Sequence, residues 1–491
     1  MSSIESINLE QPMERVLGRK RLFLENFFVY GLTGIIGRAI PFLMLPIISR
    51  IIPDISIYGV SDVMHVVVSF GAAFAGLGMY DAMFRMFFEK NDTSFKEQVC
   101  TIALKTILIS SLIVSLFTAL FSKALANALL GNEEYYGWIL FCSLQIFISG
   151  IQTIIGAPTR MQNKRKIYLV LSIINPLIGY GISIPIILFI DPLTGLMLGG
   201  FVSTLSQLAI FFWLNRRWFT HNEKNREIAK ELLKIGLPLV PVFLIYWVFH
   251  SCDRIMISQM LGLEQNGIYA IGSKVSQVSQ LIYTAFAGGW QFFAFSTMKD
   301  KDHPHLIGKV WKRLFLITTM SFIFVYSFRD LIFSLLFEGV YQKGSQVMPY
   351  LFICPLLLML YQINGTQFQI VKKTYFSPII LTVGALLNII LNFVLIPVIG
   401  IKGAAFATLI GYICTLSLSI FITSKFHLID IDRKTIFLYI LFCIIILITI
   451  FDLTVLNISL FAIYTLICLI EVKDKARSVS NVIKYFFGGG K

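Results

Sequence analysis

Charged residues are scarce in this chain of 491 residues, and acidic residues are the scarcest of them. Only 14% of the positions are charged and 27 are Asp or Glu, whereas a soluble domain has about 25% charged residues. The chain is instead 56% hydrophobic, with a mean hydropathy of +0.78 and 44 Phe. This composition excludes an ordinary soluble protein and predicts an integral membrane protein, with no nucleic-acid partner despite the basic pI of about 9.4.

Motifs for catalysis and metal binding are also missing. The seven cysteines are scattered with no CxxC pair and fall in or beside apolar segments, which is typical of small core residues. The six histidines do not cluster, so we expect no metal site and no cofactor. There is no HExxH, no P-loop and no paired-carboxylate DDxxD motif. The sequence therefore does not favour an enzyme.

Apolar segments long enough to cross a membrane fill most of the chain. A crossing helix needs about 20 residues, and about fourteen segments approach or exceed that length. These segments are 23–49, 57–82, 99–122, 136–158, 167–190, 193–214, 232–253, 266–295, 310–337, 348–371, 376–397, 401–424, 435–451 and 454–471. The sequence thus predicts an all-α integral membrane protein of about 14 transmembrane helices. The last two segments are short, and a hairpin that only just spans is the alternative for 435–471.

Lysine and arginine are distributed unevenly between the connections. Alternate connections and the two tails hold 32 of the 41 Lys and Arg residues, whereas the intervening connections hold six. Short cytoplasmic loops retain basic residues, so this alternation predicts that both termini are cytoplasmic. The polar first 22 residues lack the apolar core and cleavage site of a signal peptide, which agrees with that orientation.

The chain also divides into two similar halves. The basic entry at 163–168 recurs at 371–376, and the short outer turn at 192–195 recurs at 400–403, each about 207–208 residues later. Because this offset spans six helices, the halves are predicted to be parallel repeats, as in alternating-access transporters. The predicted divisions are a cytoplasmic tail at 1–22, a six-helix bundle at 23–214, a cytoplasmic linker at 215–231, a second six-helix bundle at 232–424, two additional helices at 435–471 and a cytoplasmic tail at 472–491.

The first helix of each half is rich in glycine and proline. Proline removes a backbone donor and kinks a helix, and matched interrupted helices indicate a moving element or a binding site. The alternative is that both residues are simply common in membrane helices. The residues are Gly31, Gly34, Gly37, Pro41 and Pro46 in the first helix, and Gly236, Pro238 and Pro241 in the seventh.

Three cations lie inside apolar segments and need a separate explanation. Arg38 lies near the middle of the first segment, where an Arg costs about 2.5–3.5 kcal/mol, so it should face a cavity or the bundle interior. Lys274 lies roughly 12 Å below the outer end of the eighth segment. Lys105 is close to the inner end of the third segment and is predicted to extend to the membrane surface.

Other polar residues occur at a similar depth. Gln277 shares a helix face with Lys274, and Asp62 and His65 share a face of the second segment, so all are candidates for one cavity with Arg38. Asp62 and His65 are also candidates for proton or sodium coupling, unless they merely pair with each other and Lys274 extends to the lipid headgroups.

A further cluster lies at the predicted outer end of the seventh segment. Interface anchoring is the simplest interpretation of its charged and polar side chains. His250 and Arg254 are four residues apart, so they share a helix face and are candidates for a gate.

Several short stretches resemble the bacterial polysaccharide flippases of the multidrug/oligosaccharidyl-lipid/polysaccharide exporter superfamily. Their order and spacing carry the resemblance, which covers nearly the whole chain. The stretches are LPIISR at 45–50 with IYG at 57–59, DRIMI at 253–257 with GIYA at 267–270, and NIILN at 388–392 with IP at 396–397, Gly400 and GAA at 403–405.

The resemblance implies two six-helix bundles of the MATE type around a central cavity, with two additional C-terminal helices. It also implies transport of undecaprenyl-diphosphate-linked oligosaccharide from the inner to the outer leaflet of the bacterial cytoplasmic membrane. The product would supply O-antigen of lipopolysaccharide, capsule or exopolysaccharide, with a polysaccharide polymerase and chain-length machinery as candidate partners. Arg38 and Lys274 match cationic positions of related peptidoglycan-precursor flippases, whereas Asp62 and His65 depart from their arginine in helix two.

Three alternatives remain open from the sequence. A peptidoglycan-precursor flippase would use the same cations, whereas a multidrug cation antiporter would need buried carboxylates in their place. A membrane polysaccharide polymerase or lipid-linked glycosyltransferase would need a large outer loop or an acid/base cluster, and the sequence has neither.

Overall fold

The computed structural model describes residues 37–220, 225–451 and 453–473, and this part of the chain contains helices and no strands. In these residues, nine helical segments are long and apolar enough to cross a membrane. One of them, α16 (Phe376–Lys425), turns back at Ile399 and Gly400, so it contains both predicted segments 376–397 and 401–424. The fourteen-segment count stays a prediction, and Gly31, Gly34 and nearly all of the two tails lie outside the described residues.

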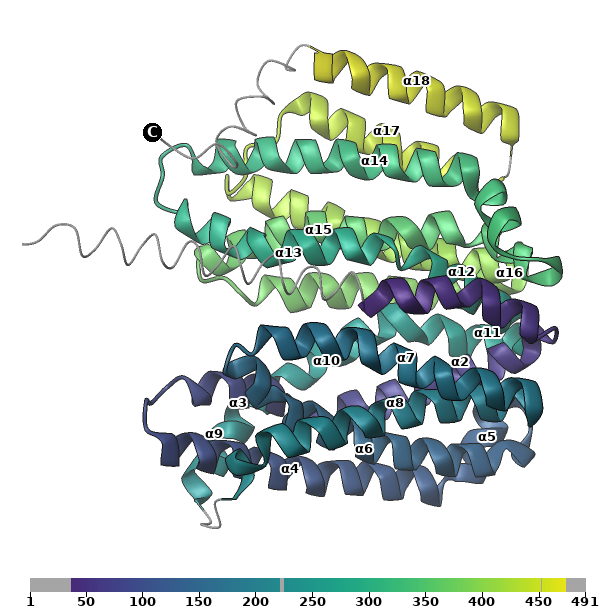
Figure 1. Cartoon of the computed structure of the whole chain (residues 1–491). Helices are drawn as coiled ribbons and strands as arrows, with labels where there is room; N and C mark the ends of the chain where they lie inside the picture. The colour runs from purple at the N-terminus through teal and green to yellow at the C-terminus, as the bar shows by residue number, and fades with distance from the viewer. Residues whose placement is uncertain (1–36, 221–224, 452, 474–491) are drawn as a thin grey trace, which may run out of the picture.

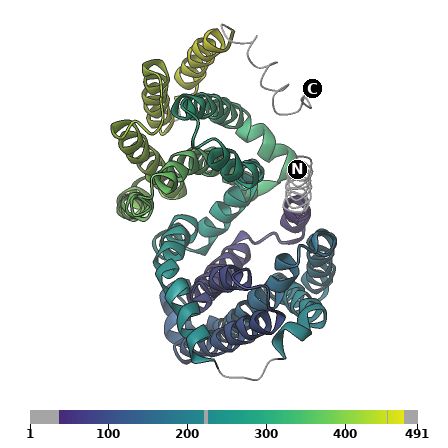
Figure 2. The ribbon, with the colours of Figure 1, turned by 90° about the vertical axis from the view of Figure 1, so that its left-hand side faces the viewer.

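The helices form two bundles, with two further helices at one side (Figures 1 and 2). The first bundle contains a helix over 37–51, α2 (Ile55–Gly76), α3 (Met79–Phe87), α4 (Thr93–Leu120), α5 (Ser122–Leu130), α6 (Tyr136–Met161), α7 (Arg165–Phe189) and α8 (Pro192–Asn215). The second contains α10 (Val240–Trp247), α11 (Asp253–Leu261), α12 (Leu263–Ser276), α13 (Ser279–Ser296), α14 (His303–Leu336), α15 (Met348–Ile370) and α16. Beside α14, away from the first bundle, lie α17 (Arg433–Thr449) and α18 (Thr454–Lys473).

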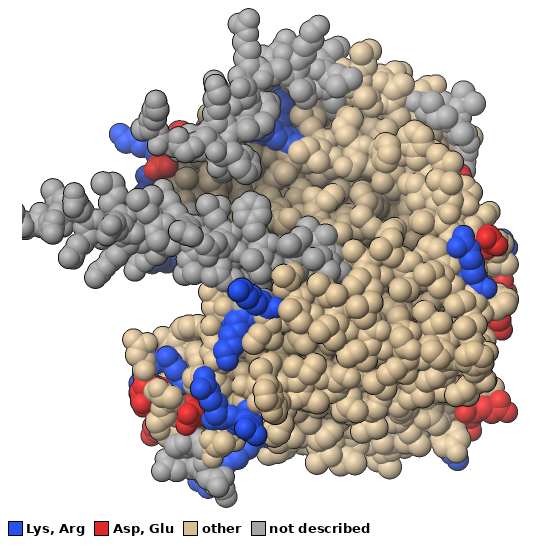
Figure 3. Space-filling view, viewed as in Figure 1, with Lys and Arg blue, Asp and Glu red and all other residues tan. Residues whose placement is uncertain are grey.

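Charged side chains on the visible face gather at the two ends of the bundles, and a broad uncharged band separates them (Figure 3). Large apolar side chains such as Leu120, Phe189 and Val398 are exposed on the helices. An uncharged band of this kind is what hydrocarbon requires, because a charged group in the bilayer centre is costly. The surface therefore fits a membrane protein.

The two matched entries have the same backbone turn. Asn163 and Lys372 both have a positive φ, 55° and 60°, and both precede a basic residue. Lys164 N donates to Thr159 O at 3.1 Å, and Lys373 N donates to Phe368 O at 2.8 Å. These bonds close the helix before each turn in the same way. The repeated sequence thus has a repeated geometry, with an offset of 209 rather than 207–208 residues.

Three predicted segments are broken or longer than the sequence indicated. Segment 57–82 is two helices, α2 and α3, because Leu77 and Gly78 take positive φ and the Gly78 backbone approaches that of Gly236 too closely for a Cβ. Segment 266–295 is broken at Gln277 and Val278, between α12 and α13.

The seventh segment is the third correction. It does not end at 253, because it continues through a 3-10 turn, α10 and a π-helical turn (Val248–Cys252) into α11, which ends at Leu261. The helix α9 (Arg226–Gly236) precedes it and begins inside the predicted linker. α9 packs on α3 and α4 of the first bundle.

The bundles contact each other closely at one end, called here the closed end. Gly59 of α2 lies against the backbone of Leu263, and Gly267 of α12 lies against the backbone of Ile55, so neither position has room for a Cβ. Asn266 Nδ2 donates to Gly59 O at 3.0 Å. Small residues let helix backbones approach in this way. The contact is symmetric between the two halves. Gly59 and Gly267 are 208 residues apart, and so are the residues that they contact in the opposite half, Ile55 and Leu263.

A second set of contacts strengthens the closed end. Ser258 Oγ of α11 donates to Leu129 O of α5 at 3.0 Å, and Gln259 Nε2 donates to Ala128 O at 2.7 Å. The Tyr341 hydroxyl, in the connection after α14, donates to Ile52 O at 2.5 Å. The closed end is therefore held by backbone packing and by hydrogen bonds between the two bundles.

Candidate functional site

A cavity of about 470 Å³ lies where the two bundles meet. We call it the central cavity. Its walls come from the helix over 37–51, α7, α11, α12, the break after α12 and the start of α13. The lining residues are Arg38, Ala39, Pro41, Phe42, Leu45, Tyr180, Arg254, Lys274, Gln277, Val278 and Leu281. The structure thus brings Arg38, Lys274 and Gln277 together, as the sequence predicts, and adds Arg254.

Arg38 extends from the first bundle toward the second. Its Nη1 donates to Thr284 Oγ1 of α13 at 3.2 Å. Thr284 in turn donates to Gln280 O at 2.7 Å, so the threonine oxygen is held in place as an acceptor. The partner of this guanidinium is therefore a neutral hydroxyl, which leaves the positive charge uncompensated by that contact.

Lys274 extends from the second bundle toward the first. Its Nζ donates to the Tyr58 hydroxyl of α2 at 2.8 Å and lies 4.3 Å from the centre of the Tyr58 ring. Both interactions are with a neutral side chain. Gln277 lines the same cavity from the break between α12 and α13, three residues further along.

Arg254 has a charged partner, in contrast to the other two cations. Its Nη1 lies 3.2 Å from Asp62 Oδ1 of α2, and its Nη2 donates to Ser273 Oγ at 3.1 Å. Asp62 is only 3% exposed. Among the described residues, Asp62 Oδ2 and Arg254 Nε have no hydrogen-bond partner. The pair is therefore buried and joins the two bundles.

The interpretation of Arg254 as part of an outer helix end was wrong. The π-helical turn carries the helix onward to Leu261, and this places Arg254 inside the molecule. Asp253 is buried as well, where its carboxylate accepts hydrogen bonds from the Tyr269 hydroxyl and from Arg254 N. The sequence signal that could have indicated this is the six charged or polar residues between 250 and 259, which a lipid-facing helix would not tolerate.

Neither histidine lines the central cavity in the described part of the chain. His65 Nδ1 lies 2.7 Å from Ser61 O, and its Nε2 lies near Gly200 of α8. His250 Nδ1 lies 2.8 Å from Tyr246 O. Asp62 bonds to Arg254 rather than to His65, so the alternative in which Asp62 and His65 simply pair is wrong.

One property unites the three cavity cations. Each of them contacts a residue of the opposite bundle: Arg38 contacts Thr284, Lys274 contacts Tyr58, and Arg254 contacts Asp62. Sequence reasoning missed all three partners, because each pair is separated by about two hundred residues. One indication of two of these partners was present in the sequence: Tyr58 and Asp62 lie on either side of Gly59, the glycine at which α2 contacts α12.

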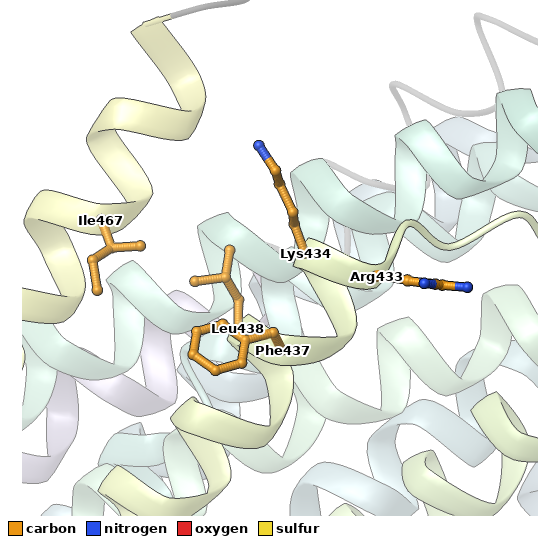
Figure 4. A pocket seen from close by; sticks show the side chains of 5 residues that line it. All are labelled: Arg433, Lys434, Phe437, Leu438 and Ile467. Atoms are coloured by element: carbon orange, nitrogen blue, oxygen red, sulfur yellow. The ribbon is translucent and has the colours of Figure 1, made fainter.

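Two further hollows lie outside the central cavity. An apolar groove of about 530 Å³ lies beside it and is described below. The other lies between α17 and α18, where Phe437 and Leu438 are directed toward Ile467, with Arg433 and Lys434 also in its lining (Figure 4). No group of His, Cys, Asp or Glu that could hold a metal ion occurs within the described ranges.

Comparison with known proteins gives a family match and a fold. A family model described as polysaccharide biosynthesis protein matches residues 47–345. An uncharacterized membrane protein of Methanocaldococcus jannaschii is 25% identical over 194 residues, which is 38% of this chain and 38% of that protein.

Solved structures extend the fold over nearly the whole chain. A lipid II flippase, MurJ, in an inward closed conformation has a TM-score of 0.65 at 16% identity, covering 92% of this chain and 99% of the flippase. An inward-facing multidrug resistance MATE family transporter of the MOP superfamily has a TM-score of 0.59 at 16% identity, over 80% of this chain and 98% of the transporter. A Vibrio cholerae MATE transporter has a TM-score of 0.57 at 12% identity, over 82% and 97%. The two-bundle fold is therefore shared with these proteins.

Proposed function

Because the chain belongs to the polysaccharide biosynthesis protein family, we propose that it carries undecaprenyl-diphosphate-linked oligosaccharide across a bacterial cytoplasmic membrane. The family and the fold identify a membrane transporter and not an enzyme. The oligosaccharide would be a repeat unit of O-antigen, capsule or exopolysaccharide, delivered from the inner to the outer leaflet.

The observation that carries this proposal is the charge balance of the central cavity. Arg254 is neutralised by Asp62, whereas Arg38 and Lys274 have neutral hydroxyl partners. A phosphate oxygen adds the attraction between opposite charges to the hydrogen bond, which a neutral hydroxyl does not offer. A diphosphate entering the cavity would therefore displace Thr284 and Tyr58 as the hydrogen-bond partners of these two cations, and it would bring a negative charge into direct contact with both.

This exchange links substrate binding to movement. The hydroxyl partners of Arg38 and Lys274 lie on the opposite bundle, so a bound diphosphate would replace two contacts that hold the bundles together. A ligand shifts a conformational equilibrium only through different interactions in the two states. The alternation of basic connections supports an outer location for the closed end. In our proposal, the described conformation thus receives substrate from the cytoplasm, and opening of the closed end releases it.

Asp62 is the best candidate for coupling to an ion. It is buried, its Oδ2 has no partner in the described part of the chain, and it holds Arg254 across the bundle interface. Protonation of this carboxylate would weaken that contact. His65 is the second candidate, through its Nε2 on the side of α8. Sodium coupling is the alternative, with transport following a sodium gradient instead of a proton gradient.

The charge of the cavity also separates the alternatives. A cationic drug would be repelled by Arg38 and Lys274, so the multidrug antiporter is disfavoured. A peptidoglycan precursor presents the same diphosphate and differs only in its headgroup. The family match favours a polysaccharide unit over that precursor.

A reconstituted assay tests the proposed function. Purified protein in liposomes should move fluorescent undecaprenyl-diphosphate-linked oligosaccharide to the opposite leaflet with its mass unchanged, and lipid II should move more slowly. Transport of lipid II alone would assign the peptidoglycan pathway. A change in substrate mass would assign an enzyme, and no movement of either lipid would reject the proposal.

A further inference from the structure

The apolar groove and the central cavity are neighbours that share two residues. The groove has a volume of about 530 Å³ and lies between the helix over 37–51, the end of α12, α14 and the start of α15. Phe42 and Val278 line both hollows. The groove residues are Phe42, Val275, Val278, Met320, Ser321, Phe324, Val325, Ile332, Met348 and Phe352.

The shared residues stand in a fixed relation to the two uncompensated cations. Phe42 is four residues after Arg38, and Val278 is four residues after Lys274. Arg38 and Phe42 lie in one helix, where residues four apart are neighbours on the surface. Val278 lies in the break that directly follows α12, which carries Lys274. Arg38 and Lys274 therefore each have an apolar residue nearby in the chain at the point where the cavity meets the groove. This is the arrangement that a molecule with an anionic head and a hydrocarbon chain would need.

We infer that the groove binds the first isoprene units of the polyprenyl chain whose diphosphate lies in the central cavity. This inference rests on the proposed function and adds to it a site for the lipid part of the substrate. Nine of the ten groove residues are apolar and the tenth is Ser321. Phe324 is 59% exposed, so the groove opens outward toward the hydrocarbon of the membrane. Met320 and Met348 have flexible side chains that adapt to an irregular chain.

The hollow between α17 and α18 does not serve the same substrate molecule in this way. It shares no residue with the central cavity, and all five of its lining residues belong to α17 and α18 (Figure 4). Those helices lie beside α14, away from the first bundle (Figure 1). Of these two hollows, the groove at Phe42 and Val278 is the one that shares residues with the central cavity, and this continuity decides between them.

The position of the groove has a consequence for the path of the substrate. Its α14 residues, from Met320 to Ile332, lie in the part of α14 that leads to the closed end. The chain would thus enter the outer half of the bilayer while the diphosphate is still in the cavity. A hydrocarbon chain crosses the midplane without losing any hydration, so this order is physically inexpensive. The head then follows when the closed end opens.

Binding of two probes to the full-length protein in nanodiscs tests the site. The probes are undecaprenyl diphosphate and methyl diphosphate, which share the diphosphate and differ in the chain. Ser321→Trp should fill the groove and weaken undecaprenyl diphosphate about fivefold, a modest change because the chain exchanges lipid contacts for protein contacts. Methyl diphosphate should bind as in the wild type.

A control lies one turn away on the same helix. Ile317 is 52% exposed and does not line the groove, so Ile317→Trp should leave both affinities unchanged. Phe324→Ala, which removes a groove wall without adding bulk, should again weaken only the long-chain probe. Equal loss of both probes, or no loss of the long-chain probe in either groove variant, would overturn the inference. Failure of the proposed function gives a different result, because the wild type would then bind neither diphosphate.

Discussion

The helices α2 and α12 occupy equivalent places in the two bundles, but they carry different chemistry. They begin 208 residues apart, at Ile55 and Leu263, and each contributes one glycine to the closed end. One turn deeper the equivalence is lost, because Asp62 corresponds to Ala270 and Val66 corresponds to Lys274. The sequences of α2 and α12 are thus alike where the two backbones touch, and they differ where charged side chains line the cavity.

This difference explains how one interface can be both a closure and a binding site. The closed end needs two surfaces of the same shape, which a repeated glycine provides. The cavity needs a net positive charge to bind an anion. If α12 carried an acidic residue at the position equivalent to Asp62, the two acids would cancel more of that positive charge. A single acid on α2 balances Arg254, and Arg38 and Lys274 remain for an anionic substrate.

The largest expected effect comes from removing the one buried acid of α2. Asp62→Asn removes the ion-pair partner of the buried Arg254 guanidinium and leaves Asp253 as the remaining nearby acid, so it should cost about 3 kcal/mol of stability. Thermal unfolding in detergent would show this as a strongly lowered Tm. The double variant Asp62→Asn with Arg254→Met should recover part of the loss, since it removes the unpaired charge. If the single variant is as stable as the wild type, Asp62 and Arg254 are not a coupled pair.

The next effect concerns Arg38 and Lys274, the two cavity cations whose hydrogen-bond partners in the described part of the chain are hydroxyl groups. Arg38→Gln and Lys274→Gln each remove a charged hydrogen-bond donor worth about 1.5–3 kcal/mol, so transport in proteoliposomes should fall about 10–100-fold. Lys105→Gln is the matched control, because Lys105 lies outside the cavity lining. Transport by Lys105→Gln should equal the wild type. Normal transport by both cavity variants would remove the cations from the mechanism.

The glycines of the closed end should give a smaller effect. Gly59→Ala places a methyl group against the Leu263 backbone and should cost about 1–3 kcal/mol by overpacking, which separates α2 from α12. Leu263→Cys, which keeps the backbone that contacts Gly59, should then react faster with a membrane-impermeant maleimide in a background without the native cysteines. Gly76→Ala, on the same helix with open space around it, is the control. Equal labelling in the two variants would contradict a glycine closure.

The smallest effect is expected far from both helices, at the start of α17. Asp432 is partly buried, which raises its pKa, but hydrogen bonds from Thr435 and from Lys312 outweigh this and lower the pKa below its usual 3.8. The ionised Asp432 carboxylate therefore stabilises the folded protein when the pH is above the ordinary pKa of an Asp side chain. This stabilisation is lost as the pH falls through the lower pKa that Asp432 has in the folded protein.

Asp432→Asn should therefore cost less than about 1 kcal/mol at neutral pH, and nothing at a pH below the lowered pKa. Unfolding measured as a function of pH would check the direction. Transport should be unaffected, because Asp432 contacts neither α2 nor α12. An equal loss at neutral and at very acidic pH would show that the carboxylate charge plays no part.

Much of the architecture could be predicted because hydrophobic length and loop charge are local signals. The predicted outer turn at 400–403 begins at Gly400, where the backbone of α16 turns, and Arg38, Lys274 and Gln277 do line one cavity. The break at Gln277 and Val278 has no glycine or proline to mark it, so the sequence indicated one continuous helix.

The partners of the cavity cations could not be predicted for a different reason. Arg254 follows a π-helical turn, and the sequence alone suggested that a polar cluster there ends the helix. Its position inside the molecule depends on Asp62, which lies 192 residues earlier. Such a pair is defined only when the two bundles meet, and no local pattern in either segment reports it.

The relative affinity for undecaprenyl diphosphate and undecaprenyl monophosphate tests the central claim most directly. Both probes have the same chain, so the ratio reports only on recognition of the second phosphate by the cavity cations. The wild type should prefer the diphosphate about tenfold or more, and the combined variant Arg38→Gln and Lys274→Gln should bind both lipids equally. An unchanged preference in that variant would contradict the account, because the diphosphate would then be recognised elsewhere.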